Sequence, residues 1–170
     1  MVLLRRKITQ IRLHRFLRVS FHLLIISLLT ASCASQKARL REKQVGEVIA
    51  TAKTYMGTPY KYGGTTRSGM DCSALTIHAF QAINLSLPRS AEDQSAVGQK
   101  IKQKDLQPGD LVFFATGKRR RKVTHVGLVT DVRRHSVKFI HASTSLGVIE
   151  TDLSQDYYAK RYRLARRIID

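Results

Sequence analysis

The chain has few cysteines, few acidic residues and no long apolar run. Only two of its 170 residues are cysteine, Cys33 and Cys72, which excludes the disulfide framework on which many small secreted domains depend. The longest apolar stretch, Val19 to Leu29, is interrupted by polar residues and falls short of the roughly 20 residues that a membrane-spanning helix needs. No internal repeat or low-complexity tract is present. The sequence therefore predicts one domain with its own hydrophobic core.

The shortage of acidic residues leaves a strong positive charge. The 12 Asp and Glu residues stand against 30 Lys and Arg residues, which gives a formal net charge of +18. Six of the basic residues precede residue 19, and residues 33–170 alone still carry +12. A surplus of this size favours an anionic partner, such as nucleic acid, phospholipid, lipopolysaccharide or a cell-wall polymer. An export signal at the start of the chain selects the envelope polymers among these and argues against nucleic acid.

That export signal occupies the first 32 residues. Basic residues without acids precede the apolar stretch, and the small residues Thr30-Ala31-Ser32 follow it directly before Cys33. Small residues before a cysteine resemble a bacterial lipobox, in which the cysteine is diacylated and becomes the new N-terminus. We therefore expect residues 1–32 to be a lipoprotein signal peptide and Cys33 to be the lipidation site. The alternatives are an ordinary signal peptide cut near Ser32 and an uncleaved anchor.

A short polar segment separates this signal from the folded part of the chain. Residues 34–41 are small and polar and show no apolar periodicity, so residues 33–44 are predicted to be the lipidated N-terminus and a tether. Ala34 occupies the position at which Asp commonly retains bacterial lipoproteins at the inner membrane, which favours the outer membrane. Residues 45–170 are then the predicted domain, which we expect to be a monomer.

The spacing of apolar residues changes along this domain. Apolar residues recur at helical spacing between Val45 and Met56 and between Cys72 and Ile83, and Ser90 is a candidate cap for a third, short helix. Short apolar runs bounded by turn residues then predict strands at residues 111–114, 126–129, 137–140, 147–149 and 162–168. Helices followed by strands predict an α+β domain, with N-terminal helices packed on a mainly antiparallel sheet.

Cys72 is the candidate nucleophile of this domain. It stands at the predicted start of a helix, where backbone N–H groups favour the thiolate and lower the pKa of the thiol. His125 and His141, on successive predicted strands, are the candidate base and the residue that orients it. One alternative is a buried cysteine that only packs. Another is a Cys–His–His zinc site, although the chain has no second cysteine pair at ligand spacing.

Six motifs follow one another in an order that is typical of one family. They are Gly57-Thr58-Pro59-Tyr60-Lys61-Tyr62-Gly63-Gly64, Asp71-Cys72-Ser73, Leu87-Pro88-Arg89-Ser90, Pro108-Gly109-Asp110-Leu111-Val112-Phe113-Phe114, His125-Val126-Gly127 and His141-Ala142-Ser143-Thr144. Together they resemble the motifs of the NlpC-type cell-wall peptidases, which are papain-like cysteine peptidases that cut peptidoglycan stems. With the lipoprotein start, the resemblance is strongest to the outer-membrane murein endopeptidases.

The resemblance agrees with the roles that the residues themselves indicate. Cys72 would attack the carbonyl carbon of the scissile bond as a thiolate paired with the imidazolium of His125, and His125 would then protonate the leaving amine. His141 would hydrogen-bond the far nitrogen of His125 and fix its tautomer. The resemblance also implies that the hydroxyl of Tyr60 is an oxyanion donor, beside the backbone N–H of Cys72.

The two residues that flank the nucleophile resemble substrate-positioning residues of the family. These are Asp71 and Ser73. An acid beside the sulfur opposes thiolate formation, so Asp71 is expected to bind the free amine of the substrate and to be held away from the sulfur.

The resemblance implies hydrolysis of the D-alanyl to diaminopimelate crosslink of peptidoglycan, without a metal or other cofactor. The D-glutamyl to diaminopimelate bond of the stem is the alternative within this class. Alternatives of other classes are a non-catalytic wall-binding lipoprotein and a polyanion-binding domain that uses the basic run Lys118 to Lys122. The expected partners are peptidoglycan stem peptides, a membrane reached through the lipid on Cys33, and anionic envelope polymers.

Overall fold

The first helix of the domain extends further towards the N-terminus than its apolar spacing indicated. The computed structural model describes residues 35–117 and 121–170, so the predictions for the signal peptide and for Cys33 concern residues outside the described ones. Residues 35–53 are helical, and the predicted tether is therefore helix from residue 35 onward. Residues 35–40 are all exposed, which is why they carry no apolar periodicity. Val45, Val48 and Ala52, spaced three and four residues apart, are buried.

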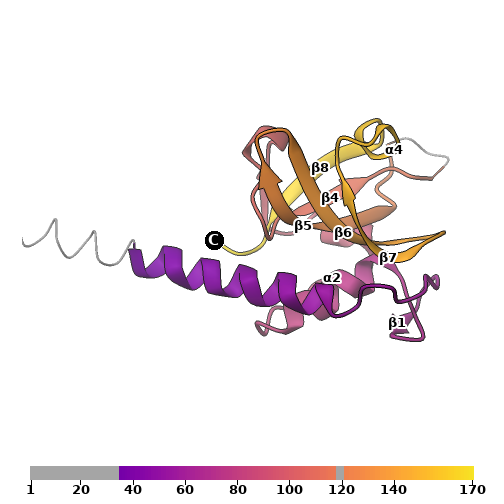
Figure 1. Cartoon of the computed structure of the whole chain (residues 1–170), viewed down its shortest axis with the longest axis horizontal. Helices are drawn as coiled ribbons and strands as arrows, with labels where there is room; N and C mark the ends of the chain where they lie inside the picture. The colour runs from indigo at the N-terminus through magenta and orange to yellow at the C-terminus, as the bar shows by residue number, and fades with distance from the viewer. Residues whose placement is uncertain (1–34, 118–120) are drawn as a thin grey trace, which may run out of the picture. The chain divides into compact units, whose positions relative to one another are not determined.

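A small hairpin leads from this helix to the candidate nucleophile. Strands β1 (Thr65–Thr66) and β2 (Gly69–Met70) pair antiparallel, and helix α2 (Cys72–Gln81) begins two residues later (Figure 1). A Cβ at Gly64 would lie 2.4 Å from the carbonyl oxygen of Gly69, so the chain can fold this tightly only with glycine at that position. The hairpin was not predicted, and it fixes where α2 starts.

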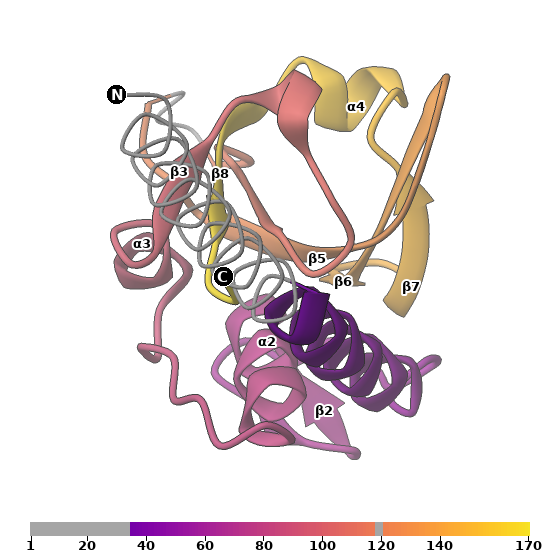
Figure 2. The same ribbon diagram turned by 90° about the vertical axis from the view of Figure 1, so that its left-hand side faces the viewer.

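The second half of the domain is the predicted antiparallel sheet. Its strand order is β3-β8-β4-β5-β6-β7, and every neighbouring pair is antiparallel (Figure 2). The strands are β3 (Gln99–Ile101), β4 (Leu111–Phe114), β5 (His125–Arg133), β6 (Ser136–Ser143), β7 (Gly147–Asp152) and β8 (Tyr162–Arg167). The first four predicted strands correspond to β4, β5, β6 and β7, and the predicted C-terminal strand corresponds to β8. The α+β class predicted from the sequence is confirmed.

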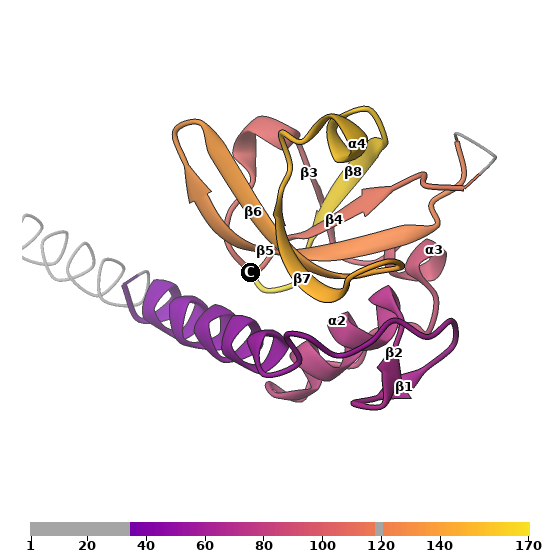
Figure 3. The same ribbon diagram turned by 45° about the vertical axis from the view of Figure 1, so that its right-hand side comes forward.

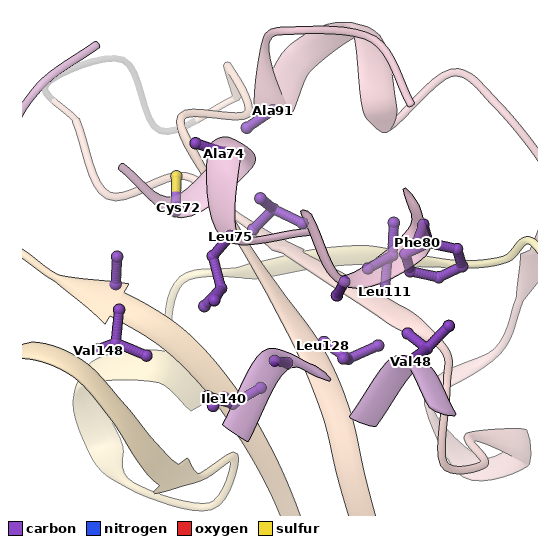
Figure 4. Close-up of a cluster of buried hydrophobic side chains, with 14 of the residues drawn as sticks. Val48, Cys72, Ala74, Leu75, Phe80, Ala91, Leu111, Leu128, Ile140 and Val148 are labelled. Carbon is purple, nitrogen blue, oxygen red and sulfur yellow. The ribbon is translucent and has the colours of Figure 1, made fainter. Parts of the chain in front are cut away.

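Each face of the sheet packs against its own helices. The face towards the first helix and α2 holds the larger core, which includes Leu75, Leu128 and Ile140, and Figure 4 shows these side chains with Cys72 at the start of α2. The opposite face holds a smaller cluster that includes Phe114 and Phe139, covered by α4 (Asp156–Ala159). Figure 3 shows α2 and α4 on either side of the strands. Successive residues of a strand point to opposite faces, which lets one sheet support both clusters.

Two further short elements complete the path around the sheet. They are α3 (Ala91–Gln94) and the 3₁₀ helix η1 (Gln103–Asp105). The predicted cap of α3 is confirmed, because the hydroxyl oxygen of Ser90 accepts from the backbone N–H of Asp93 at 3.1 Å.

The motif around Asp110 ties the sheet to the first helix. Gly109 has a φ of +90°, and a Cβ there would lie 2.8 Å from a methyl group of Val45. Asp110 is fully buried and accepts two hydrogen bonds from Arg167 on β8, both at 2.8 Å. The motif is therefore structural: glycine permits the close approach, and the ion pair joins the start of β4 to β8.

Candidate active site

The geometry of Cys72 follows from the start of α2. Asp71 is the N-cap residue in extended conformation, and its carboxylate accepts from the backbone N–H of Ala74 at 2.8 Å. Cys72 is therefore the first residue of the helix, as predicted, and it is 7% exposed. The thiol sits at the helix N-terminus but has little contact with solvent.

Burial has a larger effect on this thiol than the helix does. Burial raises the pKa of Cys72 to about 11, and the neighbouring Asp71 carboxylate raises it too. Backbone N–H groups of Val126, Ser73 and Cys72 itself favour the thiolate and lower the pKa, but by less. The expectation of a lowered thiol pKa was wrong for this structure, because it counted the helix N-terminus and left out the loss of water around the sulfur.

The two candidate histidines form a hydrogen-bonded pair. His125 opens β5 and His141 lies on the neighbouring strand β6. Nε2 of His125 and Nδ1 of His141 are 3.0 Å apart, and the two rings are nearly perpendicular, at 84°. The predicted pairing of these side chains is thus present in the structure, in the arrangement that an orienting residue requires.

Both imidazoles are buried in their neutral forms. Burial lowers the pKa of His125 to about 4. Burial and the charge of His125 lower the pKa of His141 to about 3. Because the thiol pKa is raised while the imidazole pKa values are lowered, the resting site favours a neutral thiol and a neutral imidazole over the predicted ion pair.

The thiol reaches the first residues of β5, the strand that begins with His125. The sulfur of Cys72 interacts with the backbone N–H of Val126, the residue that follows His125, and α2 packs on β5. Since Nε2 of His125 is engaged by His141, Nδ1 is the ring nitrogen left to exchange a proton with the thiol. The arrangement can generate a thiolate by proton transfer to His125 at the moment of attack.

Asp71 is held by a network that the sequence did not reveal. Arg89 donates to both carboxylate oxygens, at 3.0 and 2.6 Å, and the hydroxyl of Ser73 donates to one of them at 3.0 Å. The backbone N–H of Gly63 donates at 3.1 Å. Burial alone would raise the pKa of Asp71, but the hydrogen bonds from Arg89, Ala74 and Ser73 hold it below its ordinary value. Asp71 is therefore an ionised carboxylate with its oxygens already occupied.

Arg89 was visible in the sequence only as part of the motif Leu87-Pro88-Arg89-Ser90, and no role was assigned to it. It also donates to the hydroxyl oxygen of Ser73 at 2.9 Å. The three side chains on both sides of Cys72 thus form one charged network. This network positions the residues that the sequence analysis had assigned to the substrate, and the free amine that was expected to bind Asp71 would have to compete with Arg89.

A cleft of about 550 Å³ opens beside this network, and Tyr60, Cys72 and Arg89 are among the residues that line it. Burial, followed by the charges of Cys72 and Asp71, raises the pKa of Tyr60. The phenol therefore keeps its proton and can donate a hydrogen bond, as an oxyanion donor must. Lys122, from the predicted basic run, forms an ion pair with Glu92 at 2.9 Å in the same lining.

A second hollow, of about 400 Å³, lies on the side of the histidines. Its lining includes His125, Thr151 and Tyr158, and it has no Asp, Glu, Lys or Arg among the described residues that form it. The candidate active site thus has a charged hollow that Cys72 lines and an uncharged hollow that His125 lines.

The structure brings the sequence-predicted residues into two groups, and the sulfur of Cys72 links them through the backbone N–H of Val126. Tyr60, Asp71, Cys72 and Ser73 line one cleft, and His125 and His141 are hydrogen-bonded beside the other. Cys33 lies outside the described residues. Within residues 35–117 and 121–170, no group of three or more His, Cys, Asp and Glu side chains is arranged to hold a metal ion.

An α+β domain with a cysteine at a helix start, packed on an antiparallel sheet that carries a histidine pair, defines a papain-like cysteine peptidase. The comparisons with known proteins identify the family within that class. Residues 57–167 match the NlpC/P60 family, and the chain belongs to this family of cysteine peptidases that act on peptidoglycan. The resemblance seen in the six sequence motifs is confirmed.

Relatives and solved structures agree with this assignment. The chain is 38% identical over 154 residues to the probable endopeptidase NlpC of Escherichia coli K12, covering 86% of this chain and 97% of that protein. It is 38% identical over 116 residues to the murein DD-endopeptidase MepS/murein LD-carboxypeptidase of the same organism, covering 68% of this chain and 58% of that one. The crystal structure of an NlpC/P60 family protein from Bacillus cereus superposes with a TM-score of 0.67 at 29% identity, covering 74% of this chain and 40% of that one.

Proposed function

We propose that this protein is a peptidoglycan endopeptidase that hydrolyses the D-alanyl to diaminopimelate crosslink between stem peptides. The observation that carries the proposal is that the sulfur of Cys72 interacts with the backbone N–H of Val126, the residue after His125, while the ring of His125 is hydrogen-bonded to His141. The choice of bond is supported by the similarity to a protein named as a murein DD-endopeptidase, at 38% identity.

In the proposed reaction the nucleophile and the base exchange one proton. The thiol of Cys72 passes its proton to His125 and the sulfur bonds to the carbonyl carbon, while the backbone N–H of Cys72 and the hydroxyl of Tyr60 stabilise the oxyanion. The C–N bond breaks as His125 returns that proton to the leaving amine. Water then gives a proton to His125 and attacks the thioester, which releases the carboxylic product and restores the thiol on Cys72.

The anchoring of the enzyme is part of the same proposal. A diacyl chain on Cys33 and a basic domain together supply two membrane signals, which give stable attachment where one chain alone is marginal. This places the catalytic domain in the bacterial envelope, on the outer membrane and facing the periplasm. Among the residues that the structure describes, no helix has both the length and the apolar character needed to cross a bilayer.

Mass spectrometry of muropeptides identifies the bond. Purified enzyme is incubated with crosslinked wall and, separately, with uncrosslinked stem peptides. Loss of dimers with a matching gain of tetrapeptide monomers is the expected result. Release of dipeptide fragments from uncrosslinked stems would instead show that the enzyme cuts the D-glutamyl to diaminopimelate bond. No new product from either substrate would favour a wall-binding protein without catalytic activity.

Intact-mass analysis of the membrane fraction tests the anchor. Wild-type protein should start at Cys33 and carry the added mass of the lipid, and Cys33→Ala should lack that mass and leave the membrane fraction or stay unprocessed. An unmodified Cys33 in membrane-bound wild-type protein would contradict the anchor.

A further inference from the structure

A third side chain continues the row of hydrogen bonds that begins at His125. The far ring nitrogen of His141, Nε2, lies 3.0 Å from the hydroxyl oxygen of Thr151 on β7. His141 is fully buried and Thr151 is 7% exposed, so water cannot easily replace the hydroxyl as a partner of this nitrogen. Neither the sequence motifs nor their order pointed to Thr151.

The register of the sheet explains why this threonine is in reach. Thr151 pairs with Phe139, and His141 pairs with Ile149 two residues earlier on β7. Residues two apart on a strand share a face, so Thr151 and His141 are diagonal neighbours on one face of the sheet. The ring of His141 stacks on Phe139 at 4.9 Å between centroids, which holds Nε2 towards β7.

The direction of the hydrogen bonds is settled once His125 carries the proton from Cys72. Imidazolium has two N–H donors, so Nε2 of His125 must donate to Nδ1 of His141, which then has to be an acceptor. The proton of a neutral His141 is in that case on Nε2, and the hydroxyl oxygen of Thr151 is the acceptor 3.0 Å away.

The opposite direction works against catalysis. If the hydroxyl of Thr151 donated to Nε2 of His141, the proton of His141 would be on Nδ1 and would point at Nε2 of His125. His125 could not then hold a second proton without two donors facing each other. An acceptor at residue 151 therefore favours the protonated form of His125, and a side chain without an oxygen leaves the buried N–H of His141 unpaired.

We propose that Thr151 is a positioning residue of the active site, which accepts a hydrogen bond from His141 and so selects the tautomer that lets His125 take the proton of Cys72. The proposal rests on the assignment of Cys72, His125 and His141 made above. It extends the site by one residue on β7, beyond the nucleophile, the base and its orienting partner.

The surroundings of the two rings leave few other groups that can change their protonation. The titratable groups that face them are Tyr158 of α4, each other, and Cys72 of α2, whose sulfur interacts with the backbone N–H of Val126 next to His125. Burial raises the pKa of Tyr158 to about 12, so this phenol stays neutral where the enzyme works. A substitution of Thr151 should therefore change the protonation of His125 and His141 directly.

The test compares Thr151→Val, which removes the oxygen at nearly constant volume, with Thr151→Ser, which keeps it. Thr130→Val is the matched control, because Thr130 is another threonine with a buried hydroxyl oxygen in this sheet and interacts with Glu150, outside the active site. The full-length protein is used in detergent. The folded protein is alkylated with iodoacetamide at a series of pH values without substrate, and the rate at Cys72 is measured on the peptide that contains it after digestion. In a separate assay, kcat and KM are measured on a crosslinked muropeptide.

Thr151→Val should lower the alkylation rate and kcat by about tenfold to a hundredfold, the effect of leaving the buried N–H of His141 without an acceptor, with KM unchanged. In this variant the fall of the alkylation rate on the acid side should move to lower pH, because the imidazolium of His125 is less stable. Thr151→Ser and Thr130→Val should stay within about threefold of wild type. If Thr151→Val unfolds, Thr151→Ala replaces it.

Several results would overturn the proposal. Alkylation of Thr151→Val within about twofold of wild type would show that the hydroxyl does not act on the histidine pair. A rise in KM alone would make Thr151 a substrate contact, and equal losses in the Val and Ser variants would make its role purely structural. If the alkylation results hold but the wild type releases no muropeptide, the positioning role stands and the proposed substrate is wrong.

Discussion

Removing the guanidinium of Arg89 should destabilise the fold and slow the nucleophile together. Arg89 donates to both oxygens of Asp71, whose side chain is 11% exposed against 48% for Arg89. Arg89→Met keeps much of the apolar stem but leaves a nearly buried carboxylate without its cation. Asp71 already raises the thiol pKa of Cys72, and its carboxylate should raise that pKa further once Arg89 no longer neutralises it.

The magnitude lies between the limits for buried and exposed ion pairs. Removing one partner of a buried pair costs about 3–5 kcal/mol, and an exposed pair contributes about 0–1 kcal/mol. Because solvent reaches about half of Arg89, we expect the free energy of unfolding to fall by about 1–3 kcal/mol at pH 7.

The pH dependence of this loss has a definite sign. The pKa of Asp71 is lowered in the folded state, so the stability that it contributes is present above the unfolded pKa of about 3.9. This contribution disappears as the pH falls through the folded pKa. The difference between wild type and Arg89→Met should therefore be largest at neutral pH and shrink towards pH 3.

Urea unfolding of the wild type, Arg89→Met, Asp71→Asn and the double variant gives the coupling between the two side chains. Arg133→Met is the matched control, since it breaks an ion pair with Asp131 in which the arginine is 77% exposed and should cost less than about 1 kcal/mol. Alkylation of Cys72 should be slower in Arg89→Met than in either wild type or the control. A coupling free energy below about 0.5 kcal/mol, or unchanged alkylation, would refute the reasoning.

The remaining predictions concern the histidines, the acid limb and the basic run. His125→Ala should be nearly inactive, whereas His141→Asn should keep more activity than His141→Ala because an amide can still accept from the ring N–H; equal activities of the two His141 variants would contradict the orienting role. Since burial lowers the pKa of His125 to about 4, kcat/KM should fall only as the pH drops through that lowered value, and an acid limb at about 6.5 would contradict a buried neutral base. Neutralising all of Lys118 to Lys122 should weaken binding to wall sacculi and flatten its salt dependence, while a collapse of turnover on a small soluble muropeptide would place the run in the active site.

Elements with a local signal were predictable from the sequence. The start of α2 could be placed because apolar residues at helical spacing begin at Cys72, although the capping role of Asp71, which accepts from Ala74, was not predicted. The long buried strands could be placed because their apolar residues are consecutive. The exposed strand β3 and the hairpin of β1 and β2 escaped prediction, since these strands are only two or three residues long and depend on pairing with partner strands and not on an apolar pattern of their own.

Interactions between distant residues were out of reach for the same reason. Arg89 lies 18 residues from Asp71, and Thr151 lies 10 residues from His141, so neither pair leaves a local pattern. The raised pKa of Cys72 depends on how completely the folded chain removes water from the sulfur. A candidate nucleophile and base could therefore be named from residue types and order, while their protonation and supporting contacts required the structure.

The central claim is that the thiol of Cys72 breaks peptidoglycan stem-peptide bonds. The most direct measurement is release of muropeptides from purified crosslinked wall by wild type, Cys72→Ala and Cys72→Ser, with circular dichroism to show that each is folded. The account predicts products from the wild type and none above background from either folded variant, because a hydroxyl in this site lacks an adequate base. Muropeptide release by Cys72→Ala at a rate near that of wild type would contradict it.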